Sequence, residues 1–346
     1  MTDNLIVASH VLCPVGRGCE QAWASVRAGL GRIGSSSVMD SNCEPIQMAL
    51  VPDEALAPLT AELDSLPLPP RARRMLRLAA PVLRNAAESA APRPIRLYLS
   101  LPHLNASDAS WLKGFAIHLV KMAELTLDAP NSRVFASGRA GALTALELAL
   151  QTLDREPDAR IVVGGVDTHL DLRLLASLEA ERRILGPRVM DGFVPGEGAA
   201  FFMLSRTADA RSRPVALRGA ATISDPGHRT GSEPARSEGL ARAVEALRAR
   251  LNEPVAPVVT VFAGLNGESF DARQWGVARL RHGDFFAPGI TLEHPADSFG
   301  DAGAATGAIL TALAATALAR GERRGPALVW AASDHEPRAC AMLEVA

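Results

Sequence analysis

Short apolar runs and helical repeats alternate along this chain, a pattern typical of an α/β protein. An apolar run over residues 4–11 predicts a strand, and a helical spacing of apolar positions follows over 21–30. The order repeats with a strand over 96–101 and a helix over 110–127. The connections between these elements are short, so we expect consecutive elements to pack beside each other.

Two segments between these elements have a different composition. Residues 34–70 are rich in Ser, Pro and acidic residues, which predicts an irregular excursion. Residues 71–90 then follow as an amphipathic helix with a basic face. That face consists of Arg71, Arg73, Arg74, Arg77 and Arg84. It is either an ordinary solvated helix exterior or a docking face for an acidic partner.

The stretch from Val134 to Ala142 contains a single hydroxyl in a turn of small residues. Apolar residues at helical spacing follow at once, so Ser137 is expected at or just before a helix N-terminus. Free N–H groups and the positive end of the helix dipole favour a nucleophile, an oxyanion or a phosphate at such a place. Serine is also a preferred helix cap, so this stretch alone leaves both interpretations open.

The next landmarks predict a parallel β-α-β unit and a glycine-punctuated loop. Residues 160–167 form a β-branched run, as in a strand buried on both faces. Residues 191–204 contain the sequence Asp-Gly-Phe-Val-Pro-Gly-Glu-Gly-Ala, which leads directly into another apolar strand. The glycines allow backbones to approach closely or to adopt positive φ.

From Pro214 onward the pattern begins again. It predicts strands over 215–223 and 257–263, helices over 237–251 and 272–280, a helix rich in small residues from about 307 to 320, and two antiparallel strands within 329–343. Dense small residues indicate a helix packed closely inside the core. We therefore expect two halves, 1–210 and 211–346, with similar element order but no repeat at the level of residues.

Composition narrows the class of protein. The 346 residues are 48 % hydrophobic and 21 % charged with a formal net charge of −2, as in a globular protein, and this charge gives no reason to expect nucleic acid or an anionic membrane as partner. The four cysteines form no C-x-x-C pair, and the histidines have no ligand spacing, so neither a metal nor another cofactor is expected. Free thiols, with no signal peptide or long apolar segment, predict a cytoplasmic protein.

Several motifs together resemble the β-ketoacyl-acyl carrier protein synthases of the thiolase superfamily. The chain is similar to this family in Val7–Gly16, in the turn Phe135-Ala-Ser-Gly, in the strand end Ile161-Val-Val-Gly-Gly-Val and, most specifically, in the string Asp191–Ala199. The resemblance implies a thiolase-like five-layer αβαβα fold with two pseudo-repeated halves. It also implies acyl carrier protein or acyl-CoA as partner, and a homodimer or a heterodimer with a ketosynthase paralogue.

The resemblance also implies decarboxylative condensation by a Cys, two His and a Lys, and these four positions differ here. They fall on Ser137, Asn266, Asp301 and Ala296. A serine hydroxyl needs a neighbouring base, an Asn transfers no proton at neutral pH, and an Asp repels a developing enolate. The residues expected to contact substrate are Phe135, Gly138, Arg139 and Glu197.

Two hypotheses follow. The first is a non-condensing subunit, comparable to the chain length factors that pair with an active synthase. The second is an acyltransferase or hydrolase with Ser137 as nucleophile, Asn266 as oxyanion donor and Asp301 or His335 as base. His335 is otherwise an exposed turn residue. An α/β-hydrolase elbow is excluded, because Phe135 and Arg139 stand where it requires glycines. A charged Arg139 near a buried helix start needs a partner, either Asp301 or Glu197.

Overall fold

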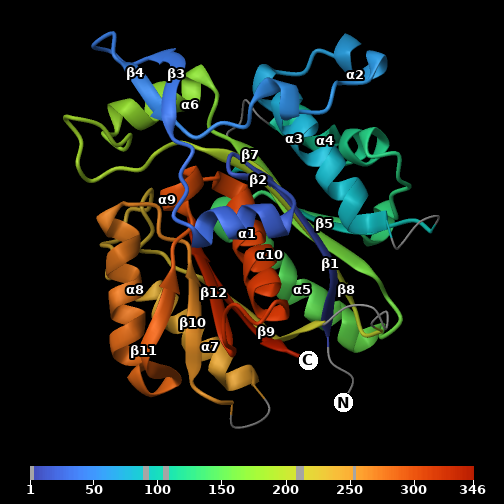
Figure 1. Cartoon of the computed structure of the whole chain (residues 1–346), viewed down its shortest axis with the longest axis vertical. Helices are drawn as coiled ribbons and strands as arrows, with labels where there is room; N and C mark the ends of the chain where they lie inside the picture. The colour runs from blue at the N-terminus through green and yellow to red at the C-terminus, as the bar shows by residue number, and fades with distance from the viewer. Residues whose placement is uncertain (1–3, 89–92, 104–108, 208–213, 252–254) are drawn as a thin grey trace.

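The elements of the N-terminal half alternate between strands and helices as predicted. The structure, a computed structural model, describes residues 4–88, 93–103, 109–207, 214–251 and 255–346 (Figure 1). The elements of this half are β1 (Leu5–Cys13), β2 (Gly16–Arg17), α1 (Cys19–Arg27), β3 (Gly34–Met39), β4 (Pro45–Met48), α2 (Ala61–Ser65), α3 (Pro70–Ala87), β5 (Arg96–Ser100), α4 (Ala109–Met122), β6 (Arg133–Phe135), α5 (Gly141–Arg155), β7 (Ile161–Thr168), α6 (Leu172–Ala180) and β8 (Glu197–Ser205).

The C-terminal half repeats much of this order. Its elements are β9 (Val215–Ser224), α7 (Gly239–Arg250), β10 (Val258–Ala263), α8 (Ser269–Arg281), β11 (Phe286–Glu293), α9 (Ala296–Phe299), α10 (Thr306–Ala319), β12 (Ala327–Ala332) and β13 (Pro337–Val345). The antiparallel pairing of β12 and β13 around a turn confirms the prediction for the chain's end.

Strand order shows the relation between the halves. In the first half the strands run β1-β8-β7-β5-β6, and in the second they run β9-β13-β12-β10-β11. Strands at the same place in the two orders also have the same rank among these strands along their half of the chain: the first strand of each half begins the order, and its last strand stands next. The two sets join where Leu5 and Ile6 of β1 pair with Ala216 and Val215 of β9. The proposed boundary between residues 210 and 211 lies outside the described residues and stays a prediction.

The fold has five layers, as the resemblance implied. One core cluster contains α5 and α10 between the two sets of strands, so these helices form the middle layer (Figure 1). A second cluster packs α3 and α4 on the outer face of the first set. A third packs α7 and α8 on the outer face of the second set. The chain is thus an α/β protein with a thiolase-like αβαβα arrangement.

The middle layer requires small residues. Eleven of the fourteen residues of α10 are buried, and most of them are Ala, Gly or Leu. A Cβ at Gly141, the first residue of α5, would lie 2.4 Å from Ser100 Oγ. Because such a contact is far closer than van der Waals distance, a larger residue at position 141 would require the side chain of Ser100 to move.

The prediction of an irregular segment over 34–70 is partly wrong. Within it β3 and β4 form an antiparallel hairpin, and α2 is a short helix. The hairpin turn is closed by Asp40 Oδ1, which accepts hydrogen bonds from the N–H groups of Asn42 and Glu44. The buried side chains of Ile46 and Met48 pack against Leu175 of α6. Strand β11 was also not predicted, because Pro288 and Gly289 interrupt its apolar pattern.

The basic face of α3 is not a simply solvated helix exterior. Its arginines are also not free to dock a partner, because they bind other parts of this chain. Arg73 binds Asp64 and the backbone oxygens of residues 64, 66 and 68. Arg77 donates to the carbonyl groups of Ala57 and Asp53. Arg74 binds Asp53 and Glu197. These arginines hold the preceding excursion onto the helix.

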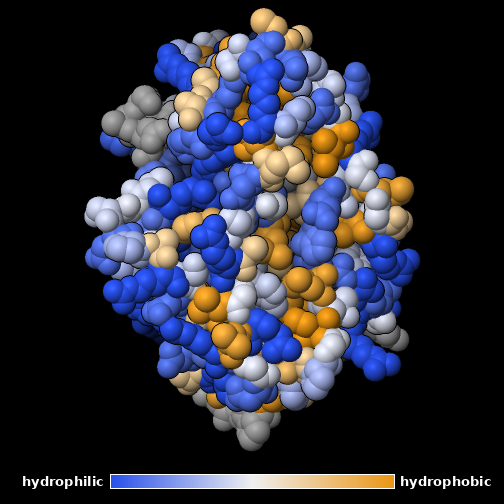
Figure 2. All heavy atoms as spheres, turned by 90° about the vertical axis from the view of Figure 1, so that its left-hand side faces the viewer, coloured by the Kyte–Doolittle hydropathy of each residue, from blue (hydrophilic) through white to orange (hydrophobic). Residues whose placement is uncertain are grey.

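The surface is mixed in polarity. Figure 2 shows the side of the molecule on which α8 and β11 lie, where several groups of hydrophobic residues interrupt a polar surface. Within the described ranges, none of the helices has the length and apolar character needed to cross a membrane.

Candidate active site

The turn that carries Ser137 connects β6 to α5 through one turn of 3₁₀ helix, Gly138–Ala140. Gly138 has a φ of +66°, a conformation that favours glycine. Ser333, at the end of β12, holds the turn from the other half of the fold: its hydroxyl donates to the Ser137 carbonyl and accepts from Ala140 N–H at 3.0 Å. Both halves therefore build this turn.

Two backbone donors near Ser137 are already used. Gly138 N–H donates to the carbonyl of Leu101 at 3.2 Å, and Ala140 N–H donates to Ser333. An oxyanion that accepted a hydrogen bond from either of these two groups would have to displace its present partner. The side chain of Ser137 makes no capping hydrogen bond, so the simple cap interpretation is wrong.

Ser137 lacks the neighbour that a serine nucleophile needs. Its side chain is half-buried, and no hydrogen bond joins it to an imidazole or a carboxylate within the parts of the chain that the structure describes. A general base must lie within about 2.6–3.2 Å of the proton that it removes, or act through one water. A serine-based mechanism has no visible base here.

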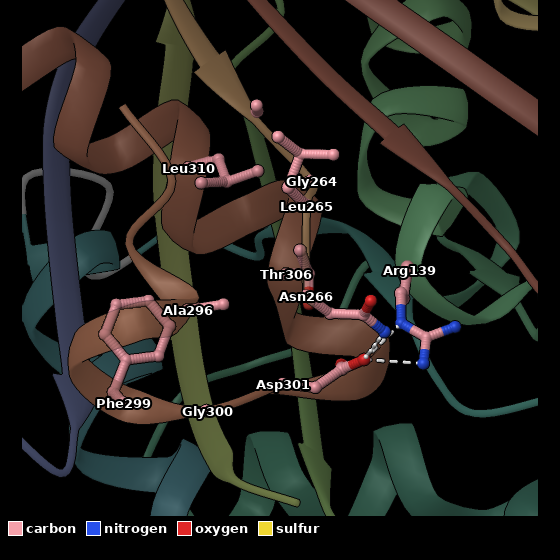
Figure 3. A pocket seen from close by; sticks show the side chains of 11 residues that line it. Arg139, Gly264, Leu265, Asn266, Ala296, Phe299, Gly300, Asp301, Thr306 and Leu310 are labelled. Carbon is pink, nitrogen blue, oxygen red and sulfur yellow. Dashed lines mark hydrogen bonds and ion pairs between the residues drawn. The ribbon is translucent and has the colours of Figure 1, made fainter. Parts of the chain in front are cut away.

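Arg139 and Asp301 form a buried ion pair between the two halves (Figure 3). Arg139 Nε donates to Asp301 Oδ2 at 2.6 Å, and the two residues are only 5 % and 2 % exposed. The other carboxylate oxygen of Asp301 accepts from Gly303 N–H at 2.7 Å. Burial raises the pKa of Asp301, but the charge and hydrogen bonds of Arg139 outweigh it and lower the pKa to about 2. Asp301 is therefore an anion at neutral pH and a poor base.

Asp301 is fixed by its backbone as well as by its side chain. Its N–H donates to Val194 at 2.8 Å and its carbonyl accepts from Gly196 N–H at 2.9 Å. A Cβ at Gly196 would lie 2.4 Å from the carbonyl oxygen of Phe299. The glycine loop of the 191–199 motif thus places the loop that carries Asp301.

Asn266 is held by the same carboxylate. Its Nδ2 donates to Asp301 Oδ2 at 2.9 Å and to Glu268 Oε2 at 3.1 Å, and its Oδ1 accepts from Glu268 N–H. Both amide hydrogens have partners, so Asn266 offers no free donor to an oxyanion.

Further charges surround this pair, and their contacts with one another were not predicted from the sequence. Arg183 binds Glu268 through two parallel hydrogen bonds of 2.9 and 2.8 Å. Asp334 receives Arg139 at 3.0 Å, Arg183 at 2.9 Å and Arg229 at 3.3 Å. These three guanidinium groups outweigh the effect of burial and hold the pKa of Asp334 far below its usual range.

One carboxyl near this network, Asp271, forms no ion pair with any residue in the described ranges. Asp271 is 4 % exposed, and Gln274 Nε2 lies 3.5 Å from its Oδ1. Burial raises the pKa of Asp271 to about 7, against the lowering influence of Arg139. Its position on α8 gave no sign of this, because an Asp in the first turn of a helix is common.

The cavity beside the ion pair is small. Figure 3 shows Arg139, Asn266 and Asp301 at one side and Phe299 and Leu310 at the other; the remaining lining residues are Ala263, Gly264, Leu265, Ala296, Gly300 and Thr306. The space open to the centre of a water-sized sphere is about 10 Å³, enough for about one water molecule. Asn266, Asp301 and Ala296, which stand at three of the four positions that the resemblance assigns to catalytic groups, line this cavity together with Arg139, whereas Ser137 does not line it.

The other predicted site residues lie elsewhere. Glu197 does not contact Arg139: its carboxylate accepts from Arg74, Thr168 Oγ1 and Val51 N–H. Phe135 packs its ring 6.1 Å from that of Tyr98.

His335 belongs to a different cluster. Its Nδ1 lies 2.9 Å from Thr230 Oγ1, and its ring stacks on His103 with centroids 3.5 Å apart. In the described parts of the chain, no three His, Cys, Asp or Glu side chains are arranged to hold a metal ion.

Part of the chain matches the model of one known protein family. Residues 123–210 match the family model of the β-ketoacyl synthase N-terminal domain. A comparison with curated proteins gives no match.

Solved structures share the whole fold. A ketosynthase from module 1 of the bacillaene synthase of Bacillus amyloliquefaciens FZB42 is 14 % identical with a TM-score of 0.78, over 100 % of this chain and 76 % of that one. The complex AntDE:AntF, a type II polyketide synthase carrier protein with its ketosynthase, is 16 % identical with a TM-score of 0.77 and full coverage of both chains. The ishigamide ketosynthase/chain length factor is 15 % identical with a TM-score of 0.72, again over the full length of both. At such identities the likeness concerns the fold.

Proposed function

We propose that this chain, which has the ketosynthase fold and the β-ketoacyl synthase match over residues 123–210, is a non-condensing, ketosynthase-like subunit of fatty-acid or polyketide-type biosynthesis. The observation that carries the proposal is the buried Arg139–Asp301–Asn266 contact, since Asp301 and Asn266 stand at two of the positions that the resemblance assigns to catalytic groups and are bound to each other there.

The groups at this site are not arranged to transfer the protons that condensation requires. Condensation in this family needs a thiolate at the Ser137 position, and a serine hydroxyl does not ionise near neutral pH without a base. Asn266 has both amide hydrogens engaged, and Asp301 is held as an anion by Arg139. None of these three groups is set up to take or give a proton at neutral pH.

The charge of Asp301 and the size of the adjoining cavity also oppose condensation. The negative Asp301 would repel a malonyl carboxylate or an enolate at the place where a cation or donor would stabilise it. The adjoining cavity has room for about one water molecule. A drug-sized ligand needs a pocket of about 300–1,000 Å³, so an extended acyl chain does not fit in this cavity.

The role left to the fold is binding. The neighbouring structures include a ketosynthase with its carrier protein and a ketosynthase/chain length factor. By analogy we propose that this chain binds an acyl carrier protein and pairs with a ketosynthase paralogue or with itself. Its cysteines are all free, which suits a reducing compartment such as the cytoplasm.

The sheet offers one suitable edge for such a pair. Strands β6 and β11 lie at its two ends. β11 contains Pro288 and a Gly289 with φ of +72°. These two residues disrupt the edge of the sheet, so another strand cannot readily pair with it. β6 has no proline, and its Val134 is 48 % exposed. We therefore propose that the partner chain pairs along β6.

Co-expression with candidate synthases tests this function. Wild-type protein should co-purify with a paralogous ketosynthase and raise the activity of that partner, and Val134→Lys should break the pair while Val345→Lys, also exposed, should not. Failure to pair with any synthase, together with product formation by the chain alone, would contradict the proposal.

The serine acyltransferase or hydrolase is the alternative, and no contact of Ser137 favours it. It makes an opposite prediction in the same experiment: a covalent acyl group on Ser137 after incubation with an acyl thioester.

A further inference from the structure

Three histidines from separate loops meet beside the Ser137 turn. His103 follows β5, His228 follows β9, and His335 lies in the turn between β12 and β13. The rings of His103 and His335 stack with centroids 3.5 Å apart and an interplanar angle of 27°. The rings of His228 and His335 have centroids 6.0 Å apart. The cluster joins the two halves of the fold.

A single hydroxyl links two of these rings. Thr230 Oγ1 lies 2.9 Å from His335 Nδ1 and 3.1 Å from His228 Nδ1. A hydroxyl can donate its hydrogen to an unprotonated Nδ1 or accept a hydrogen bond from a protonated Nδ1, so Thr230 can keep both contacts in either charge state of the rings. The contact therefore fixes where the two rings lie relative to each other.

The loops of the stacked pair also hold the Ser137 turn. Leu101, two residues before His103, accepts from Gly138 N–H and donates to the carbonyl of Phe135. Ser333, two residues before His335, donates to the Ser137 carbonyl. Separation of the two rings would pull on both sets of hydrogen bonds.

We propose that this histidine cluster is a pH-sensitive clasp, which holds the two halves together over the Ser137 turn while the imidazoles are neutral and opens when they are protonated. Two protonated rings stacked at this distance would place like charges in contact. Histidine is the side chain whose charge changes in the range of about pH 5–8.

The charges around the clasp do not remove this repulsion. Asp334 lies beside His335, but its carboxylate is bound by Arg139, Arg183 and Arg229. Glu336 is exposed, and Arg338 places a guanidinium against the His335 carbonyl at 2.6 Å. Burial lowers the pKa of His335, as do His103 and His228, against the smaller opposing effects of Asp334 and Glu336.

Hydrogen exchange of the intact protein tests the clasp. After correction for intrinsic rates, amides 138–140 of the wild type should exchange at least about tenfold faster at about pH 5.5 than at about pH 7.5, one decade for each pKa unit of linked protonation. His103→Phe keeps a flat ring but cannot be protonated, so protection should persist at both pH values. His103→Asn removes the stack, so protection should be lost at both.

The matched control is His294→Gln, which changes a histidine that pairs with Asp297 on the surface. It should behave as the wild type does. The same pH response in wild type and His103→Phe would overturn the clasp. This outcome is independent of whether the protein condenses acyl chains.

Discussion

Arg139 and Asp301 are 162 residues apart in the chain, and their side chains meet at 2.6 Å across the boundary of the two halves. The pair occupies the place where the family resemblance puts its nucleophile turn and its second catalytic histidine. A buried ion pair of this kind contributes little net stability over apolar residues, but removal of one partner leaves a buried charge. The site is therefore closed by a contact that is costly to break.

Arg139→Met should strongly destabilise the protein, because Asp301 would remain buried without its main cation. We expect a loss of about 3–5 kcal/mol in the free energy of unfolding. Denaturant unfolding measures this loss. Arg248→Met is the control: its pair with Asp284 is largely exposed and should contribute at most about 1 kcal/mol. Equal effects of the two substitutions would show that the Arg139 pair has no special role.

Asp271 should make stability fall as pH rises. Its pKa is raised from 3.8 in the unfolded chain to about 7 by burial, so between these values the folded state binds more protons than the unfolded state. Asp271→Asn should remove this slope and gain about 1–4 kcal/mol near pH 7, with little gain near pH 4. Urea unfolding between these pH values measures it.

The exposed Asp158→Asn is the control for Asp271 and should leave the slope unchanged. A gain for Asp271→Asn that is independent of pH would contradict the assignment of a protonated carboxyl.

Asp301 acts in the opposite direction. Its pKa is lowered from 3.8 to about 2, so its contribution to stability is present above about pH 4 and is lost as pH falls toward 2. Asp301→Asn should therefore destabilise at neutral pH and flatten the acid limb of the stability profile. An acid limb of unchanged steepness in this variant would show that other carboxyls cause it.

Ser333 should matter for the shape of the Ser137 turn. Ser333→Ala removes one hydrogen bond to the Ser137 carbonyl and one from Ala140 N–H, which leaves buried backbone groups unpaired. We expect a cost of about 1–3 kcal/mol and faster hydrogen exchange in residues 137–140. Ser65→Ala, whose hydroxyl donates to Glu62 in an exposed position, is the control and should cost little.

Much of the fold could be predicted because apolar patterns and short connections determine it locally. The strands around Ile161–Thr168 and the helix of small residues before Ala319 follow from such patterns. The hairpin at Gly34–Met48 and strand β11 did not, because polar, glycine or proline residues interrupt their patterns. Tertiary packing decides the structure of such segments.

The contacts of the candidate site were likewise predicted from the sequence only in part. The cost of burying Arg139 predicted a carboxylate partner, and Asp301 is confirmed as that partner while Glu197 is not. Asn266 was expected as a free donor, but two carboxylates hold its amide. The contacts of Arg183 with Glu268 and Asp334 join residues 85 and 151 positions apart, and no local pattern in the sequence indicates such pairs.

We propose that this ketosynthase fold does not form a carbon–carbon bond, and a single condensation assay can decide whether it does. The purified protein is incubated with an acyl thioester and a malonyl-loaded carrier protein. The intact masses of both proteins are then measured by mass spectrometry. We predict no mass increase on this chain, no loss of CO₂ from the malonyl group and no ketoacyl product, with Ser137→Ala indistinguishable from wild type. Stoichiometric acylation of wild type that Ser137→Ala abolishes, or a ketoacyl product, would show instead that the chain is a catalyst.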